Sequence, residues 1–405
     1  DEVREQKRVN DQLREANRLA FANGDPGARP RRLGVCVSGQ MARLELAQKV
    51  DHLLRPNRDD FVVDIVLALA VSPTPAYGNG DLDVGGRVRW TNETIRDAIG
   101  DSLGNGTVVI DNSPQYANPM VQSAYAYQRD PARGPTWNRN HVKMWSEYWL
   151  CYQQFTRLEQ ANGAPYDVLV KVRDDGWLTS DVKLSGPPLE PMWKGRVILS
   201  QCRPEGGWND RWAIMDAAHG YAYFGAQFAD YYLNFDELWR TTWNVSEREP
   251  GSPETHLRGA LALYNASVLA VDADTVPILQ GRLAPDGLGG ARFCINLHSA
   301  DLGHDPMAAA CVPTDPLARA KLYCSRCDDG AMGHVSSCER TCACLRASDS
   351  LSECNSTVMA SADFCLTSAV FNQPIEHAEC GMCLRHRCSL WGGNKCASRW
   401  GFTDP

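Results

Sequence analysis

A short run of mostly apolar, β-branched residues from Val168 to Val172 constrains the fold of this chain more than any other stretch. Turn-forming residues, Asn162-Gly163 and Pro165, come just before it. A run of this length and composition, bounded by turn signals, is typical of a strand buried within an α/β sheet. The sequence therefore predicts a sheet with this strand in its interior.

Two adjacent carboxylates, Asp174 and Asp175, end the run, with Arg173 just before them. Open α/β sheets bind their ligands outside the carboxyl ends of the strands. Neighbouring carboxylates are hard oxygen donors that suit Mg²⁺ or Mn²⁺, and such an ion can hold a diphosphate. The alternative interpretation is a strand that leaves the core into a solvated acidic turn.

Predicted strands and helices alternate on both sides of this strand. The strands cover residues 33–37, 61–71, 107–110, 195–199 and 268–271, and the helices cover 41–54, 91–99, 137–160 and 253–264. This alternation predicts an α/β fold with a Rossmann-like, mostly parallel sheet and helices on both faces.

The chain divides into three segments by composition. Residues 1–32 are a polar, stem-like helix and linker, residues 33–305 the α/β domain, and residues 306–405 a small cysteine-rich module. The N-terminal helix is either the end of a stem or a helix docked on the domain. The chain begins at Asp1 rather than Met, which leaves room for an upstream signal or membrane anchor.

Cysteines and glycosylation sequons indicate an oxidising compartment. Twelve of the sixteen cysteines lie between Cys311 and Cys396, a density expected of a disulfide scaffold. The net charge of −8 gives no sign of the basic face that nucleic-acid binding needs. Asn-x-Ser/Thr sequons, which agree with a secretory-pathway protein, stand at Asn92, Asn105, Asn244, Asn265 and Asn355.

Two Cys-x-x-Cys pairs in the module, Cys324–Cys327 and Cys380–Cys383, imitate half-sites for zinc. In a lumenal chain we favour disulfides, whose pairing the sequence does not decide. The module either recognises an acceptor or another protein, or fastens the C-terminus.

The first predicted strand leads into Ser38-Gly39-Gln40, a tight turn before a predicted helix. Backbone N–H groups at the start of that helix, with Arg43 one turn in, form an expected site for a phosphate or a nucleotide. The stretch has neither the G-x-G-x-x-G pattern nor a P-loop lysine, so it predicts anion binding without naming the nucleotide.

Four stretches, in order, give the chain a family resemblance. They are Ser38-Gly39-Gln40-Met41-Ala42-Arg43, Tyr166 to Asp175, Asn209-Asp210-Arg211-Trp212 and Ser252-Pro253-Glu254-Thr255-His256-Leu257. Over residues 33–300 the chain resembles the metal-dependent, nucleotide-sugar glycosyltransferases of the GT-A fold, in particular a branch that begins with a Ser-Gly-Gln-x-x-Arg turn. The resemblance does not extend to the cysteine-rich module.

The resemblance implies that Asp174 and Asp175 are the metal-binding acidic motif. Mn²⁺ or Mg²⁺ would bridge the diphosphate of the donor, expected to be a UDP-sugar. It also implies a later histidine ligand, for which His298 is the expected residue and His304 the other choice. The family pattern is Asp-x-Asp, whereas the acids here are adjacent or spaced as Asp175 and Asp181, so which carboxylate touches the ion stays open.

Donor-binding and catalytic roles follow from the same resemblance. An inverting transfer needs a general base near the acceptor hydroxyl, and Asp210 and Glu254 are the expected candidates. Asp210 is equally typical of a turn residue that bonds its own backbone, and Glu254 of a carboxylate stabilised in the first turn of a helix. The residues with an implied donor-binding role are Ser38, Gly39, Gln40, Arg43 and Arg173.

The sequence thus predicts a Golgi glycosyltransferase that moves a sugar from a nucleotide-sugar to a hydroxyl of a glycan or glycoprotein acceptor. It would be a type II membrane protein, held at the membrane only through an upstream anchor. The alternative is a non-catalytic secreted or lumenal glycoprotein that binds carbohydrate or protein on the same scaffold. A metal-dependent hydrolase would need more clustered His and Asp ligands than the sequence contains.

Overall fold

The structure is a computed structural model in which residues 1–21, 29–71, 76–77, 80–81, 90–113, 134–178, 180–202, 206–246, 252–285 and 291–295 are described. The predicted metal ligand His298, its alternative His304 and the cysteine-rich module lie outside these residues. The chain splits into two compact units. Unit 1 combines Asp1–Ser72, Trp90–Asp174 and Asp181–Val271, and unit 2 combines Pro73–Arg89, Asp175–Ser180 and Asp272–Pro405.

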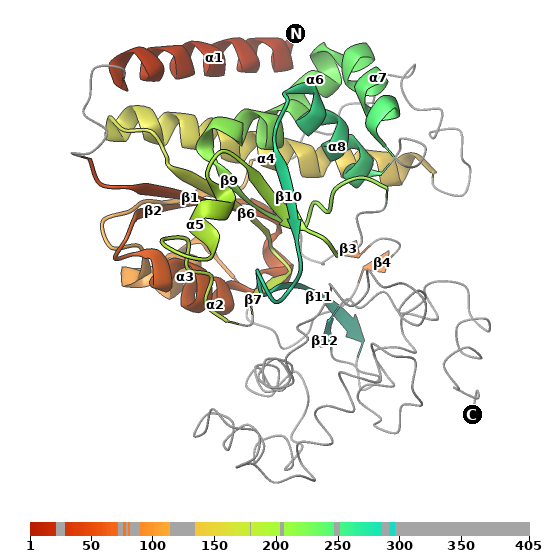
Figure 1. Cartoon of the computed structure of the whole chain (residues 1–405). Helices are drawn as coiled ribbons and strands as arrows, with labels where there is room; N and C mark the ends of the chain where they lie inside the picture. Colours follow the sequence, from red (N-terminus) through yellow and green to blue (C-terminus); the bar gives the residue numbers. More distant parts are fainter. Residues whose placement is uncertain are drawn as a thin grey trace, which may run out of the picture. The chain divides into compact units, whose positions relative to one another are not determined.

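Unit 1 carries the main elements (Figure 1). Its helices are α1 (Glu2–Phe21), α2 (Leu46–Lys49), α3 (Asn92–Ile99), α4 (Gly134–Asn162), α5 (Leu189–Trp193), α6 (Ala226–Leu233), α7 (Phe235–Val245) and α8 (Pro253–Leu263). Its strands are β1 (Arg32–Gln40), β2 (Val62–Ala70), β5 (Val108–Asp111), β6 (Val168–Arg173), β8 (Val197–Ser200), β9 (Trp212–Asp216) and β10 (Val268–Val271).

These seven strands form one sheet, here called the main sheet, in the order β10-β8-β9-β6-β1-β2-β5. Strand β9 pairs antiparallel with both of its neighbours, and every other pair is parallel. Six strands therefore run in one direction and β9 runs against them. This arrangement confirms the predicted α/β class, with a mostly parallel sheet and flanking helices.

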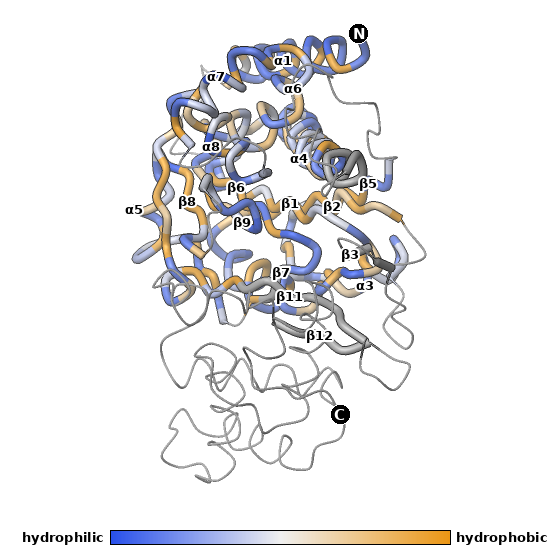
Figure 2. Tube along the Cα trace, turned by 90° about the vertical axis from the view of Figure 1, so that its right-hand side faces the viewer, coloured by the Kyte–Doolittle hydropathy of each residue, from blue (hydrophilic) through white to orange (hydrophobic). Residues whose placement is uncertain are grey.

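The interior of the main sheet is apolar because helices cover both of its faces. Parallel strands buried in this way read as nearly continuous hydrophobic runs, as β2 does with Val-Val-Asp-Ile-Val-Leu-Ala-Leu-Ala. Figure 2 shows the hydrophobic colour along β2 and β8, whereas hydrophilic residues predominate on α1. The predicted interior strand, β6, is buried from Val168 to Val172.

Helix α4 packs on β1 and β2, and α1 packs in turn on α4 and α6 (Figure 1). The Asn17 side chain of α1 donates to the Thr156 carbonyl of α4 at 3.1 Å. Of the two alternatives for the N-terminal helix, the structure therefore shows a helix docked on the domain. A buried disulfide between Cys36 of β1 and Cys151 of α4 joins the sheet to this helix. It closes a loop of 115 residues and thereby restricts the unfolded chain.

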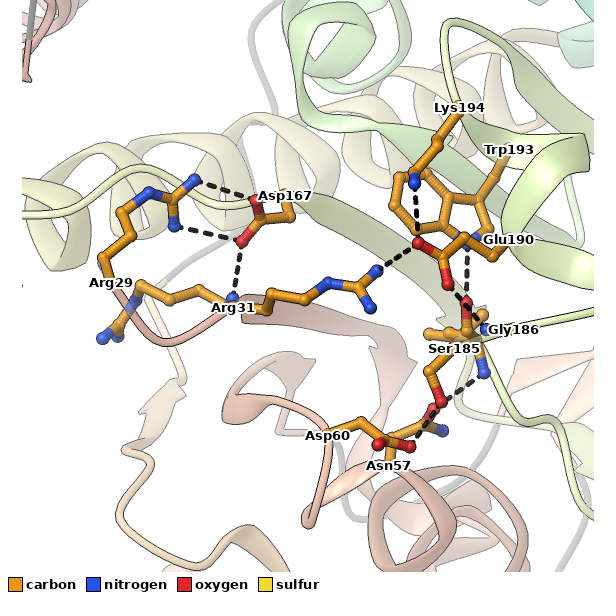
Figure 3. A network of polar contacts seen from close by, with 12 residues as sticks. Arg29, Arg31, Asn57, Asp60, Asp167, Ser185, Gly186, Glu190, Trp193 and Lys194 are labelled. Carbon is orange, nitrogen blue, oxygen red and sulfur yellow. Dashed lines mark hydrogen bonds and ion pairs between the residues drawn. The ribbon is translucent and has the colours of Figure 1, made fainter. Parts of the chain in front are cut away.

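Ion pairs gather at the amino edge of the main sheet, where β1, β6 and β8 begin (Figure 3). Arg29 binds both carboxylate oxygens of Asp167, at 2.8 and 3.1 Å. Glu190 accepts from Arg31 at 3.1 Å and pairs with Lys194 at 2.7 Å. These contacts fasten the segments that lead into the strands.

Unit 2 contributes two small sheets. One has the order β12-β11-β7 and is antiparallel, with β7 at Gly176–Leu178, β11 at Ile278–Pro285 and β12 at Ala291–Ile295. The other pairs β3 (Ala76–Tyr77) with β4 (Gly80–Asp81). No helix among the described residues is long and apolar enough to cross a membrane.

Candidate active site

The strand order of the main sheet marks a ligand site. From β1 the chain moves outward to β2 and β5, and then returns to the other side of β1 as β6. Open α/β sheets bind ligands outside the carboxyl ends of the strands, at the point where the order reverses. Here the reversal falls between β1 and β6, which end at Gln40 and Arg173. We call this end of the sheet the carboxyl edge.

Asp174, the first residue after β6, is held in a buried ion pair at this edge. Arg43 binds its carboxylate at two points, Nε to Oδ2 at 2.6 Å and Nη2 to Oδ1 at 2.9 Å. The backbone N–H of Gln40 also donates to Oδ2, at 2.9 Å. Asp174 and Asp175 are 0% and 1% exposed, which excludes the alternative of a solvated acidic turn.

Gly39 makes this arrangement possible. Its φ of +138° is a conformation that only glycine adopts readily, and a Cβ at this position would stand 2.1 Å from Asp174 Oδ1. The predicted donor-binding residues Gly39, Gln40 and Arg43 are therefore brought together with Asp174. Ser38, also predicted, lies beside Arg173 in the register of β1 and β6.

The helix predicted for residues 41–54 forms only in part. Strand β1 runs on to Gln40 and a single helical turn follows at Met41–Arg43; after a break at Leu44 and Glu45 the chain is helical again through α2 and a π-helical stretch at Val50–Leu54. The backbone N–H of Glu45 donates to the Asp174 carbonyl at 3.0 Å, and Glu45 has a non-helical backbone conformation, so the helix is interrupted here. The continuous helical stretch therefore begins at Leu46 rather than directly after the Ser38-Gly39-Gln40 turn, and Arg43 is buried against Asp174.

The reversed strand β9 brings Asp210 to the carboxyl edge. Because β9 runs against β6, its first residue, Trp212, pairs with Val172 near the end of β6. The backbone N–H of Arg173 donates to the Arg211 carbonyl at 3.3 Å. Asp174 follows Arg173 and Asp210 precedes Arg211, so this hydrogen bond brings the two aspartates to the same end of the sheet. Asp210 itself is 4% exposed.

Glu254 reaches the same place from α8. Ser252 caps this helix by accepting from the backbone N–H of Thr255, as the sequence predicts. The Glu254 carbonyl accepts from the N–H of Trp208 at 2.9 Å, which joins the first turn of α8 to the segment before β9. The two predicted candidates for general base, Asp210 and Glu254, therefore lie close together.

The electrostatics of this carboxylate pair suit proton transfer. Burial, and then the nearby Asp210 carboxylate, raise the pKa of Glu254 to about 7. A general base works best when its pKa lies near the pH at which the enzyme operates. A pair of carboxylates whose environment shifts one pKa in this way is a common mark of acid–base catalysis.

Lys171 and Tyr148 hold the Asp210 segment, and the sequence analysis did not single them out. The Lys171 ammonium, 0% exposed on β6, donates to the Asp210 carbonyl and, at 2.8 Å, to the Tyr148 hydroxyl. Tyr148 of α4 donates in turn to Asp210 Oδ2 at 3.4 Å. A lysine inside an otherwise apolar strand is rarely buried unless it has a partner, so the position of Lys171 in the sequence could have indicated its role.

Glu147 is a second residue that the sequence analysis missed, because a glutamate on a long amphipathic helix attracts no notice. It is 4% exposed on α4. Burial, and next the Asp174 carboxylate, raise its pKa well above the ordinary value, while Arg43, Arg173 and Lys171 lower it. The causes of this shift place Glu147 near Asp174 and near three cations of the carboxyl edge, Arg43, Arg173 and Lys171.

A divalent cation does not fit the described donors by themselves. Among the described residues no group of three or more His, Cys, Asp or Glu side chains is placed to hold a metal ion. Arg43 already occupies the Asp174 carboxylate, and a guanidinium beside a cation would repel it. Asp181, the alternative acid, is 65% exposed and pairs with His52. The metal prediction for Asp174, Asp175 and His298 stays a prediction.

Comparisons with known proteins give similarities of low score. No protein-family model matches the chain, and no curated protein sequence matches it. Mouse xyloside xylosyltransferase 1, in its apo form, matches at a TM-score of 0.29 and 7% identity, over 60% of this chain and 85% of that one. The galactosyltransferase LgtC, solved with donor and acceptor sugar analogs, matches at 0.28 and 12%, over 79% and 97%. Both are glycosyltransferases, and at these scores the likeness decides neither activity nor substrate for this chain.

Proposed function

We propose that the chain is a glycosyltransferase that moves a sugar from a nucleotide-sugar donor, expected to be a UDP-sugar, to a hydroxyl of a glycan or glycoprotein. One observation carries the proposal: the Asp210–Glu254 pair and the Arg43–Asp174 pair meet at the carboxyl edge where the strand order reverses. The first pair suits proton transfer, and the second lies where an anionic ligand is expected.

The donor diphosphate would lie against the cations of this edge. Arg173, which ends β6 and is half-buried, is the proposed contact, and the buried Lys171 two residues before it adds positive charge without touching the ligand. Guanidinium groups make strong, charge-assisted contacts to phosphate oxygens. Fixed positive charge beside the diphosphate stabilises the negative charge that develops as the nucleoside diphosphate departs.

Glu254 is the proposed general base. Its carboxylate takes the proton from the acceptor hydroxyl as that oxygen attacks the anomeric carbon, and the bond to the diphosphate breaks with its electron pair leaving on the nucleotide. Asp210 tunes the base, because its negative charge is part of what raises the Glu254 pKa to about 7. Lys171 and Tyr148 position Asp210 through the contacts described above.

The remaining predictions are kept as part of the proposal. Asp174, Asp175 and His298 are the ligands that the family resemblance implies for Mn²⁺ or Mg²⁺, which would supply positive charge to the diphosphate, and no step of the transfer is assigned to the ion. A Golgi or other secretory location is supported by the buried Cys36–Cys151 disulfide, because such bonds persist in oxidising compartments.

The test is a binding measurement followed by a transfer measurement on the full chain. Thermal unfolding is followed with UDP alone and with UDP plus Mn²⁺, since a ligand that binds the native state raises its apparent stability. Turnover of a panel of UDP-sugars is then compared for wild type, Glu254→Gln and the exposed control Glu93→Gln. A nucleotide shift with turnover lost only in Glu254→Gln supports the proposal.

The competing function is a non-catalytic binding glycoprotein on the same scaffold. It predicts no thermal shift with nucleotide and no turnover of any sugar nucleotide by the wild-type chain. A shift without turnover would keep the binding site and remove the enzymatic assignment.

A further inference from the structure

The two edge strands of the main sheet, β5 and β10, share a local feature. Each follows a helical segment, a two-residue turn and two residues outside any helix or strand. Asn105 is the second turn residue before β5, and Asn265 is the second turn residue before β10. Both asparagines are exposed, and both begin sequons, Asn105-Gly106-Thr107 and Asn265-Ala266-Ser267.

The third residue of each sequon is tied to the neighbouring strand. The Thr107 carbonyl accepts from the N–H of Ile65 in β2 at 2.9 Å, and the Ser267 carbonyl accepts from the N–H of Val197 in β8 at 2.8 Å. Asn265 has a φ of +52°, a left-handed conformation that asparagine tolerates better than most residues. Each asparagine is therefore presented on a fixed turn, three residues before an edge strand starts.

Edge strands need protection. Among the described residues no strand pairs with the outer side of β5 or of β10. An open edge presents unpaired backbone N–H and C=O groups, which invite pairing with another chain. Arg96 of α3 already covers one such group by donating to the Val108 carbonyl at 3.0 Å.

We propose that Asn105 and Asn265 carry N-linked glycans and that these two glycans shield the outer edges of β5 and β10, which no other described strand covers. In the modification the amide nitrogen of each asparagine attacks the anomeric carbon of a lipid-diphosphate-linked oligosaccharide. A C–N bond forms, the amide gives up one proton, and the C–O bond to the diphosphate breaks with the lipid diphosphate as leaving group. Both sequons lie at the amino edge, so the glycans leave the carboxyl edge open to substrate.

This inference depends on the secretory location and not on the transferase activity. The full chain is secreted from a eukaryotic cell behind a cleavable signal, and the number of glycans is read from gel mobility before and after enzymatic deglycosylation. Thr107→Ala and Ser267→Ala remove the sequons while leaving both asparagines and their backbone conformations in place. Each variant is expected to lose one glycan. Asn105→Gln serves as a second variant at the first edge, and unchanged mobility at either site overturns the proposal.

The shielding role has its own readout. The double variant Thr107→Ala/Ser267→Ala is expected to self-associate in size-exclusion chromatography at concentrations at which the wild type stays a single species. The matched control is Ser246→Ala, which removes the Asn244 sequon at the end of α7, a sequon that does not precede an edge strand. A double variant as dispersed as the wild type, or a control that associates equally, overturns edge shielding.

Discussion

At the amino edge of the main sheet, Lys194, the N–H of Gly186 and Arg31 act on the Glu190 carboxylate, and the contact with Lys194 first of all lowers its pKa to about 2. At the carboxyl edge, burial and the neighbouring Asp210 raise the pKa of Glu254 to about 7. A glutamate at the amino edge is thus surrounded by groups that stabilise its negative charge, whereas a glutamate at the carboxyl edge is buried beside another carboxylate. The amino edge favours the ionised form of its glutamate, whereas the carboxyl edge disfavours it. A carboxylate whose ionised form is disfavoured in this way is typical of functional sites.

The two edges have opposite effects on stability as pH changes. The ordinary pKa of both glutamates is 4.5. The contribution of Glu190 is present above that value and is lost as pH falls toward about 2, because the folded state holds the ionised form. Glu254 holds its proton in the folded state between 4.5 and about 7, so its contribution falls as pH rises through that window.

The largest expected effect is on activity at the carboxyl edge. Glu254→Gln keeps the shape of the side chain and removes the base, so turnover should fall by roughly 10²- to 10⁴-fold. Glu190→Gln, the same change at the amino edge, should leave turnover within about twofold of wild type. Initial rates of sugar transfer check both. Equal losses in the two variants would mean that the edges do not differ in function.

Next in size is the effect of breaking one partner of the buried ion pair. Asp174→Asn removes the carboxylate that binds the buried Arg43 guanidinium at two points, which should lower the free energy of unfolding by about 3–5 kcal/mol. Asp167→Asn at the amino edge loses a pair whose side chains are 26% and 25% exposed, and should cost only about 1 kcal/mol. Urea unfolding measures both. The double variant Arg43→Met/Asp174→Asn should regain part of the loss, and a further loss instead would contradict the explanation by a buried charge.

A smaller effect is expected in the pH profile of kcat/KM. The rate should rise about tenfold per pH unit below about pH 7 and level off above it, because the base must be deprotonated. Asp210→Asn removes a negative charge that raises the Glu254 pKa, so the rising limb should move to lower pH. A limb that stays in place in this variant would remove Asp210 from the tuning of the base.

The smallest expected effect is the stability change at the amino edge. Glu190→Gln should lower the free energy of unfolding at about pH 7 by about 1 kcal/mol or less, since its ion pairs are partly exposed. The difference from wild type should shrink as pH falls toward the Glu190 pKa of about 2. Chemical denaturation at about pH 7 and about pH 3 measures it. A difference that grows at the lower pH would contradict the charge argument.

The sequence was most informative where local patterns decide the structure. β-branched residues and turn signals located β6, and Ser252 with Pro253 located the start of α8, because capping and strand burial depend on nearby residues. The helix expected from Met41 to Leu54 is interrupted at Leu44 and Glu45, because a contact between residues far apart in sequence, the Glu45 N–H and the Asp174 carbonyl, overrides local helical preference there. Glu147 and Lys171 were missed for the same reason, because their roles come from partners that only the fold brings near.

Strand β9 has a consequence for how this site can change. The residues that lie at the carboxyl edge are those that follow each of the six parallel strands. Strand β9 runs the other way, so the residues that precede it lie at this edge. The place of Asp210 is therefore set by pairing already made along β6, from Val168 opposite Asp216 to Val172 opposite Trp212. Because β6 is also held by β1, slipping β9 by one step would turn the side chains of β9 to the opposite faces of the sheet and move the Asp210 carbonyl away from the Lys171 ammonium.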